Sequence, residues 1–147
     1  MNTLLKLDHD LVPIDSVTEP LKETRYIEGA IIWRIGRDTL LSERDVDLVD
    51  QLWAYVVDGA LESARTGRSE KYFPDQPVEL IFCRTGDKVE VTVGSERHVV
   101  PYGLFHSSLK EGGNAFFSRM RLLVPEARDT WDLYLERLAQ LSPPSSR

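Results

Sequence analysis

The chain has 147 residues, of which 41% are hydrophobic, 9% aromatic and 29% charged. These proportions are typical of one soluble globular domain and exclude a disordered chain, which has fewer apolar residues at this charge. No run approaches the ~18 consecutive apolar residues that a membrane-spanning helix requires. The single cysteine excludes an internal disulfide and any metal site built from several cysteines.

The net charge of 18 − 24 = −6 is carried entirely by residues 1–60, which hold twelve acids and six bases. Residues 61–147 hold twelve acids and twelve bases and are neutral overall. Proteins bind nucleic acids and anionic membranes through Lys and Arg, so a negative half repels both. The charge therefore predicts no nucleic-acid partner and no membrane partner, whereas a basic protein partner is compatible with it.

The chain is expected to be cytoplasmic and to form one domain. Residues 1–10 lack the apolar core of ~7–15 residues that a signal peptide needs, and the lone cysteine fits a reducing compartment. No Pro-, Gly- or Ser-rich linker divides the body. Residues 1–141 are therefore predicted as a single globular domain, with residues 142–147 as a flexible tail.

The first expected elements are strands. Residues 3–8 fit a short edge strand, and residues 9–25, with two prolines among acids, fit a loop. Residues 26–35 are rich in β-branched and aromatic side chains and predict a strand, followed by a turn at 36–38.

The strongest periodic pattern predicts a helix from residue 43 to residue 66. Ser42 is a suitable N-cap with Asp45 three positions later, and Gly67 suits the left-handed residue that ends a helix. Apolar residues recur at three- and four-residue steps and predict one buried stripe, made of Val46, Val49, Trp53, Val56, Val57, Ala60 and Ala64.

Alternating patterns at 78–84 and 88–94 flank Gly86-Asp87 and predict a hairpin, with a further strand at 97–101. A helix is expected over 102–124, where Pro125 stops it. Inside it, Gly112-Gly113 marks either a break or a place where another element packs closely.

A last amphipathic helix is expected over 130–141, with Asp129 as its cap. The order strand, helix, hairpin, helix, helix predicts an α+β fold. We expect an antiparallel sheet of about four to five strands with three helices packed mainly on one face.

The residues that usually carry catalysis do not form a recognisable set. Cys83 with His98 or His106 would supply a nucleophile and a base, but Cys83 lies mid-strand among apolar neighbours, which favours a buried, inert thiol. Asp8-His9-Asp10 would supply metal ligands only from a loop, and a solvated loop is the preferred interpretation. No Gly-x-Ser-x-Gly turn surrounds Ser107 and Ser108. The sequence therefore predicts no catalytic residue, no cofactor and no metal.

The acidic side of the predicted 43–66 helix is the leading candidate for a partner-binding surface. At 100° per residue its four acids fall within about 80° of one another and extend over ~22 Å. A solvated outer face is the plainer interpretation, but an uninterrupted row of like charges also suits docking. The predicted partner-binding residues are Glu43, Asp47, Asp50, Tyr55 and Asp58, with the tyrosine as an aromatic anchor.

Two adjacent aromatic residues, Tyr72 and Phe73, open a loop bounded by Pro74 and Pro77. They are either tucked onto the core or exposed as a contact patch. The tucked arrangement is preferred because an exposed aromatic pair promotes aggregation.

Several segments between residues 26 and 125 resemble a group of small bacterial proteins that has no assigned activity. They are Gly29-Ala30-Ile31-Ile32-Trp33, Leu40-Leu41-Ser42, Asp47-Leu48-Val49-Asp50-Gln51-Leu52-Trp53, Tyr72-Phe73-Pro74-Asp75-Gln76-Pro77-Val78 and Phe116-Phe117. In size, charge and class the chain is also similar to toxin-neutralising immunity proteins. That second resemblance rests on no motif and implies no site residue.

Three functions follow as hypotheses. The first is a non-enzymatic protein-interaction domain, of immunity or inhibitor type, whose acidic helix blocks a basic surface such as the nucleic-acid groove of a toxin. The alternative is a small-molecule-binding or enzymatic domain. Its pocket would lie between the sheet and the 102–124 helix and use His98, Tyr102 and His106. The third is a homodimer or larger homo-oligomer whose helices pair across a two-fold axis.

Overall fold

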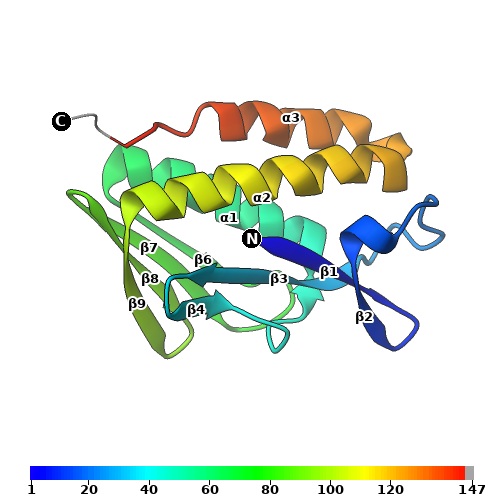
Figure 1. The fold of residues 1–147 in the computed structure, drawn as a ribbon, viewed down its shortest axis with the longest axis horizontal. Coiled ribbons are helices and arrows are strands. Elements are labelled where there is room, and N and C mark those ends of the chain that lie inside the picture. The colour runs from blue at the N-terminus through cyan, green and yellow to red at the C-terminus, as the bar shows by residue number, and fades with distance from the viewer. Residues whose placement is uncertain (145–147) are drawn as a thin grey trace.

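The computed structural model describes residues 1–144, which form an α+β fold with two antiparallel sheets and three α-helices (Figure 1). The first sheet contains β1 (Asn2–Leu7), β2 (Asp10–Pro13), β3 (Glu28–Ile35), β4 (Asp38–Leu41) and β5 (Asp47–Leu48). Its order is β2-β1-β3-β4, and β5 also pairs with β3. The second sheet, in the order β6-β7-β8-β9, contains β6 (Arg68–Tyr72), β7 (Glu79–Thr85), β8 (Lys88–Val93) and β9 (Glu96–Pro101).

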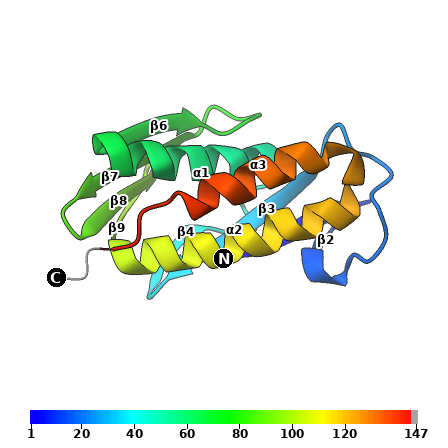
Figure 2. The same cartoon turned by 90° about the horizontal axis from the view of Figure 1, so that it is seen from above.

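The helices lie together on one side of the sheets, as predicted. They are α1 (Val49–Thr66), α2 (Tyr102–Leu123) and α3 (Arg128–Ala139), with short 3-10 turns η1 (Ile14–Ser16) and η2 (Pro125–Ala127). Seen from above, α3 runs between α1 and α2 and contacts both (Figure 2). The predicted α+β class is confirmed, and its antiparallel strands divide between two sheets.

Aromatic side chains join the sheets to the helices. Trp53 of α1 stacks on Phe116 of α2, with ring centroids 5.4 Å apart, and its indole N–H donates to Thr3 Oγ1 of β1 at 3.0 Å. Trp33 of β3 donates in the same way to Ser108 Oγ of α2 at 2.9 Å. Since a buried indole N–H needs an acceptor, these two bonds set the depth at which each tryptophan enters the core.

Helix α1 begins at Val49, and the prediction that it follows directly on Ser42 is wrong. Only half of the predicted capping box forms: Ser42 N–H donates to Asp45 Oδ2 at 2.8 Å, but Ser42 Oγ accepts from the N–H of Arg44 and not from that of Asp45, and the contact closes only one turn. The chain then becomes extended, and β5 pairs with the start of β3. This pairing outweighs the helical periodicity of residues 43–48. The C-terminal end of α1 is as predicted, since Gly67 adopts the left-handed conformation with φ 94°.

Strands β2, β4, β5 and β6 were not anticipated by the hydrophobic pattern. β2 lies inside the predicted loop 9–25 and pairs with β1 across a two-residue turn. Asp8, at φ 58°, takes the left-handed position of that turn, which aspartate tolerates better than most residues. Short edge strands with few apolar residues leave little periodic signal.

The C-terminal elements differ slightly from the prediction. Pro125 follows α2 as expected, but α3 starts at Arg128 with Ala127 at its N-cap, so Asp129 lies in the first turn and caps nothing. Ser142, the first residue of the predicted flexible tail, is held by a 2.6 Å hydrogen bond from Tyr102 Oη to its carbonyl oxygen. Residues 145–147 of that tail lie outside the described residues.

Gly112 and Gly113 are sites of close packing, which is one of the two predicted alternatives. A Cβ added at Gly113 would lie 2.6 Å from Leu138 Cδ1 of α3, and one at Gly112 would lie 3.2 Å from Trp53. α2 stays continuous through both glycines. Their missing side chains therefore let Leu138 of α3, Trp53 of α1 and the N-terminal residue Met1 approach α2.

Replacing Gly113 with alanine tests this packing. Gly113→Ala is expected to lower the free energy of unfolding by up to about 2 kcal/mol, because the cost of about 1–3 kcal/mol for displacing buried Leu138 exceeds the gain of about 1 kcal/mol in helix propensity. Gly103→Ala on the same helix should raise it by about 0.4–1 kcal/mol, since the nearest atom, Pro144 Cγ, lies 3.9 Å away. Urea unfolding midpoints measure both changes. A midpoint that rises for Gly113→Ala as much as for Gly103→Ala would contradict the close contact of α2 with α3.

Candidate functional site

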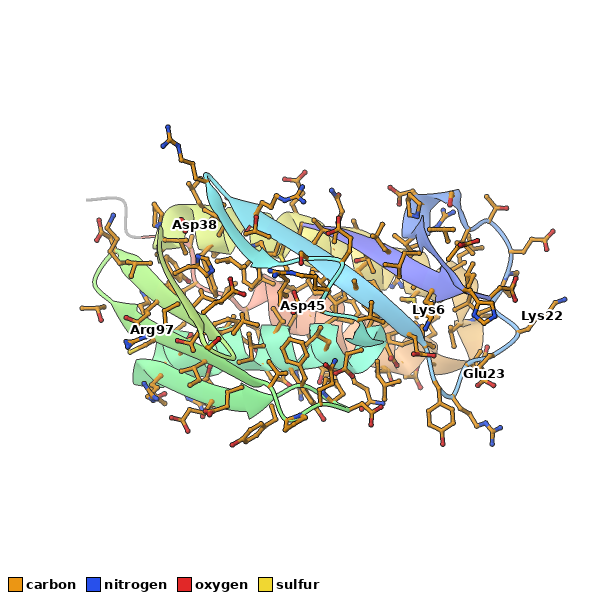
Figure 3. The ribbon with its side chains drawn as sticks, turned by 90° about the horizontal axis from the view of Figure 1, so that it is seen from below. Lys6, Lys22, Glu23, Asp38, Asp45 and Arg97 are labelled. Atoms are coloured by element: carbon orange, nitrogen blue, oxygen red, sulfur yellow. The ribbon has the colours of Figure 1, made fainter. Side chains whose placement is uncertain are left out.

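A groove of about 510 Å³ lies between the end of β1 and the segment 17–28. We call it the acidic groove. Its apolar lining comes from Leu5, Leu7, Val17, Leu21 and Ile27, and its charged lining from Lys6, Asp8, Glu19, Lys22, Glu23 and Glu28, with Tyr26 also at its wall. Figure 3 shows Lys6 beside the ends of β1 and β3, and Lys22 and Glu23 on the loop beyond them.

The groove exists because β1 and β3 separate at this end. Their ladder stops at the pair Leu5↔Gly29, although β1 itself continues to Leu7. On the other side, Glu28 is drawn toward Leu48 by the pairing of β3 with β5. The chain before β3 therefore turns away from β1, and the space between them stays open.

Helix α2 holds the outer wall of the groove. Arg119 donates through Nη2 to the carbonyl oxygen of Asp15 at 3.1 Å and to that of Val17. The main-chain N–H of Leu21 donates to the carbonyl oxygen of Leu123 at 2.8 Å. The segment is thus attached to the core at two points and carries its acids on a fixed frame.

Two large side chains stand exposed at the groove. Tyr26 is 65% exposed and Leu7 is 36% exposed. Exposed aromatic residues beside an apolar floor are the usual anchors of protein interfaces. The groove therefore offers apolar contact as well as charge.

The carboxylates at this end of the molecule are free of ion pairs. Residues 1–28 hold six acids and three bases, a net charge of −3, and none of the six acids forms a salt bridge within the described residues. Eight of the other eighteen acids do form one. Half of the chain's net charge of −6 therefore lies in the segment that forms the acidic groove, on carboxylates without ion pairs within the described residues. One of these acids, Glu23, accepts a hydrogen bond from the main-chain N–H of Arg25 at 2.7 Å.

A second hollow of about 320 Å³ adjoins the acidic groove and shares Tyr26 and Glu28 with it. Its other lining residues include Asp47, Asp75 and Gln76. Tyr26 thus stands between two hollows that are both lined by carboxylates.

Asp47, a predicted partner-binding residue, is only 5% exposed and serves the fold. Its carboxylate accepts hydrogen bonds from the main-chain N–H groups of Leu48 (2.6 Å) and Asp75 (3.1 Å) and from Gln76 Nε2 (2.9 Å). It ties the start of α1 to the loop that follows β6, so it is not displayed to a partner.

Asp58 is occupied by the protein's own side chains. It accepts hydrogen bonds from Tyr134 Oη at 3.0 Å and from Arg137 Nη1 at 2.8 Å, both on α3. Burial, together with the hydrogen bond and negative charge of Asp58, raises the pKa of Tyr134 to about 12, against the opposing charge of Arg137. This cluster docks α3 on α1.

The other predicted contact residues are dispersed. Glu43 precedes α1 and lies 4.0 Å from Arg34 in an exposed ion pair. Asp50 is half-buried in the first turn of α1, where burial raises the pKa of its carboxyl group and hydrogen bonds from the main-chain N–H groups of Asp50 and Gln51 oppose that rise. Tyr55 is half-buried. The predicted set therefore does not form one acidic face, because α1 starts six residues later than expected.

The three polar groups of the predicted enzyme pocket do not converge. Tyr102 binds the carbonyl oxygen of Ser142, and His106 Nε2 lies 3.2 Å from that of Leu141, so both hold the C-terminal segment. His98 Nδ1 lies 2.9 Å from Asp38 Oδ1, between β9 and β4.

The structure also gives the positions of three other features discussed in the sequence analysis. Cys83 is half-buried on β7. Of the aromatic pair in the loop after β6, Phe73 is 4% exposed and Tyr72 is 61% exposed, so only one is tucked onto the core. Asp8 and His9 form the turn between β1 and β2.

Within residues 1–144, no three His, Cys, Asp or Glu side chains are grouped so as to hold a metal ion. No helix in the same range is both long and apolar enough to cross a membrane.

Comparisons with protein families, with curated proteins and with solved structures find no match to this chain. The resemblance to small bacterial proteins therefore stays a prediction, and the site rests on geometry alone. The sequence contained one signal for it, which is the acidic, proline-containing stretch 9–25 within the negative half.

The structural role of Asp47 can be separated from that of Asp50 by neutralising each in turn. Asp47→Asn is expected to lower the free energy of unfolding by about 1–3 kcal/mol, because it disturbs a buried acceptor shared by three donors. Asp50→Asn should leave it unchanged or slightly higher, since burial already disfavours that charge. Urea denaturation compares them. Equal effects would contradict the role of Asp47 as a tie between α1 and the loop.

The Tyr134–Asp58 contact predicts a specific alkaline titration. Tyr134 should lose its proton near pH 12, and Asp58→Asn should lower this pKa by removing the neighbouring charge. Because the folded-state pKa lies above the ordinary value of about 10, this group's contribution to stability is complete below pH ~10 and is lost as the pH rises to about 12. Phenolate absorbance, compared with Tyr134→Phe, follows the titration. An unshifted tyrosine in Asp58→Asn would refute the contact.

Proposed function

We propose that this protein is a non-enzymatic interaction domain whose acidic groove binds a basic segment of a protein partner. The observation that carries the proposal is a 510 Å³ groove that combines an apolar floor, a 65% exposed tyrosine and carboxylates free of ion pairs. Each of these features fits a different part of such a segment.

Charge selects the partner. Glu19 and Glu23 on the segment 17–28 and Asp8 on the facing turn present carboxylates from both sides of the groove. Lys or Arg side chains entering between them exchange water for charge-assisted hydrogen bonds. The net negative field around them also speeds encounter with a positive surface, and salt weakens that effect.

Apolar contact supplies the remaining affinity. Tyr26 offers a ring whose faces attract guanidinium groups as well as aliphatic stems. Leu7 and the buried floor formed by Leu5 and Ile27 exclude water around that contact. A segment that alternates basic and apolar residues satisfies both requirements.

Within this proposal, the immunity or inhibitor type corresponds to a partner whose basic groove normally holds nucleic acid. Such a surface carries the Lys and Arg density that the acidic groove requires. Inhibition would then consist of covering that surface, without any chemical step.

Reversing the groove charges tests the proposal. Glu19→Lys/Glu23→Lys is expected to abolish capture of a basic protein from the native host and to lower its association rate constant about tenfold or more at low salt. Tyr26→Ala should accelerate dissociation with little effect on association, because it removes contact area and no charge. Biolayer interferometry on the captured partner gives both rate constants.

The matched control is Glu111→Lys/Glu136→Lys, which makes the same change in net charge at exposed acids of α2 and α3 that form no ion pair with any other residue of 1–144. It should retain most of the association rate. If both double variants slow association equally, the effect belongs to net charge and the acidic groove is not the binding site.

A further inference from the structure

The outer strands of the two sheets differ in what protects their main-chain edges. β2 is four residues long and ends at Pro13, which has no N–H for another strand. β4 contacts β8 and β9, and the His98–Asp38 hydrogen bond joins the β9 and β4 edges. Within residues 1–144, β6 ends the second sheet with no strand beside it, at the margin of the molecule (Figure 2).

The pattern of hydrogen bonds between β6 and β7 shows which main-chain groups of β6 face away from the sheet. Arg84 N–H donates to the carbonyl of Gly67 at 2.8 Å, and Phe73 N–H donates to that of Val78 at 2.9 Å. Because antiparallel ladders alternate, Ser69 and Lys71 also bond to β7, whereas the N–H and C=O groups of every second residue point away from β7. Of these groups, the Arg68 carbonyl oxygen accepts a hydrogen bond from Thr66 Oγ1 at 3.0 Å, and its second lone pair can still accept from another strand. The outward residues are Arg68, Glu70 and Tyr72.

This edge is open to solvent and nearly neutral. All three outward residues are exposed, Tyr72 by 61%. Arg68 forms an ion pair with Glu70 two positions along the strand, and Lys71 pairs with Glu62 of α1 at 3.3 Å. A second copy of this acidic chain therefore meets no net repulsion at β6, in contrast to the end that holds the acidic groove.

The edge is complementary to itself in one register. When two β6 strands run antiparallel about a two-fold axis at Ser69, Arg68 of each copy stands opposite Glu70 of the other. The two outward pairs then exchange four main-chain hydrogen bonds, and the unlike charges lie directly across the strands, where such pairs are stabilising. Shifting the axis to Glu70 would place like charges opposite each other.

We propose that two copies of this chain associate through their β6 edges, joining the two four-stranded sheets into one of eight strands. The occupant of the edge is thus a second copy, paired by Arg68 with Glu70 of the other copy. This inference is independent of the proposed function, because the acidic groove lies at β1.

Charge variants test the pairing. Wild-type protein should reach twice its 16.8 kDa mass as concentration rises toward about 1 mM in sedimentation equilibrium. Arg68→Glu and Glu70→Arg should each raise the dissociation constant about tenfold or more, because each places like charges across the interface. An equimolar mixture of the two should dimerise again, since carboxylates of one copy then face guanidinium groups of the other.

A main-chain variant tests the edge independently. Glu70→Pro removes an N–H that β7 does not use, so circular dichroism and the urea midpoint should show a folded protein that no longer dimerises. Glu70→Ala keeps that N–H and serves as its control.

Each alternative outcome overturns the proposal. Wild-type protein that stays monomeric up to about 1 mM has no such interface. Dimers that persist in both charge variants, or in folded Glu70→Pro, use another surface. A mixture that fails to dimerise while wild type does contradicts the register.

Discussion

The buried carboxylate of Asp47 is the interaction on which much of this architecture depends. It accepts hydrogen bonds from the residue that follows it and from the loop after β6, so it joins the start of α1 to the second sheet. The same two-residue strand pairs with β3 and draws Glu28 away from β1. The start of α1, its link to the loop after β6 and the opening of the acidic groove therefore all involve this two-residue strand.

The distribution of ion pairs decides which acids can act on a partner. Asp58, which the sequence predicts to face a partner, is instead neutralised by Arg137 of α3 and accepts a hydrogen bond from Tyr134 of the same helix. The six acids before residue 29 form no ion pair within the described residues, and this segment holds only three bases. At this end of the molecule, carboxylates without ion pairs therefore lie beside an exposed aromatic ring and an apolar floor.

Both proposals concern surfaces at the margins of the two β-sheets. At the acidic groove, two strands separate before the sheet ends and leave apolar side chains partly uncovered. At β6, a complete strand presents outward main-chain groups that no other strand of residues 1–144 pairs with. The first surface carries net negative charge and suits a basic protein. The second carries balanced charge in a self-complementary order and suits a copy of itself.

The sequence by itself determined the α+β class, the buried stripe of α1, the β7–β8 hairpin and the end of α2 at Pro125, because these follow from local periodicity and from turn chemistry. Only the tertiary structure decided where α1 begins, since the pairing of β5 with β3 competes with a helix at residues that favour both. It also decided that Asp47 and Asp58 turn inward. The partners of a carboxylate come from distant elements, and no spacing along the chain reveals them.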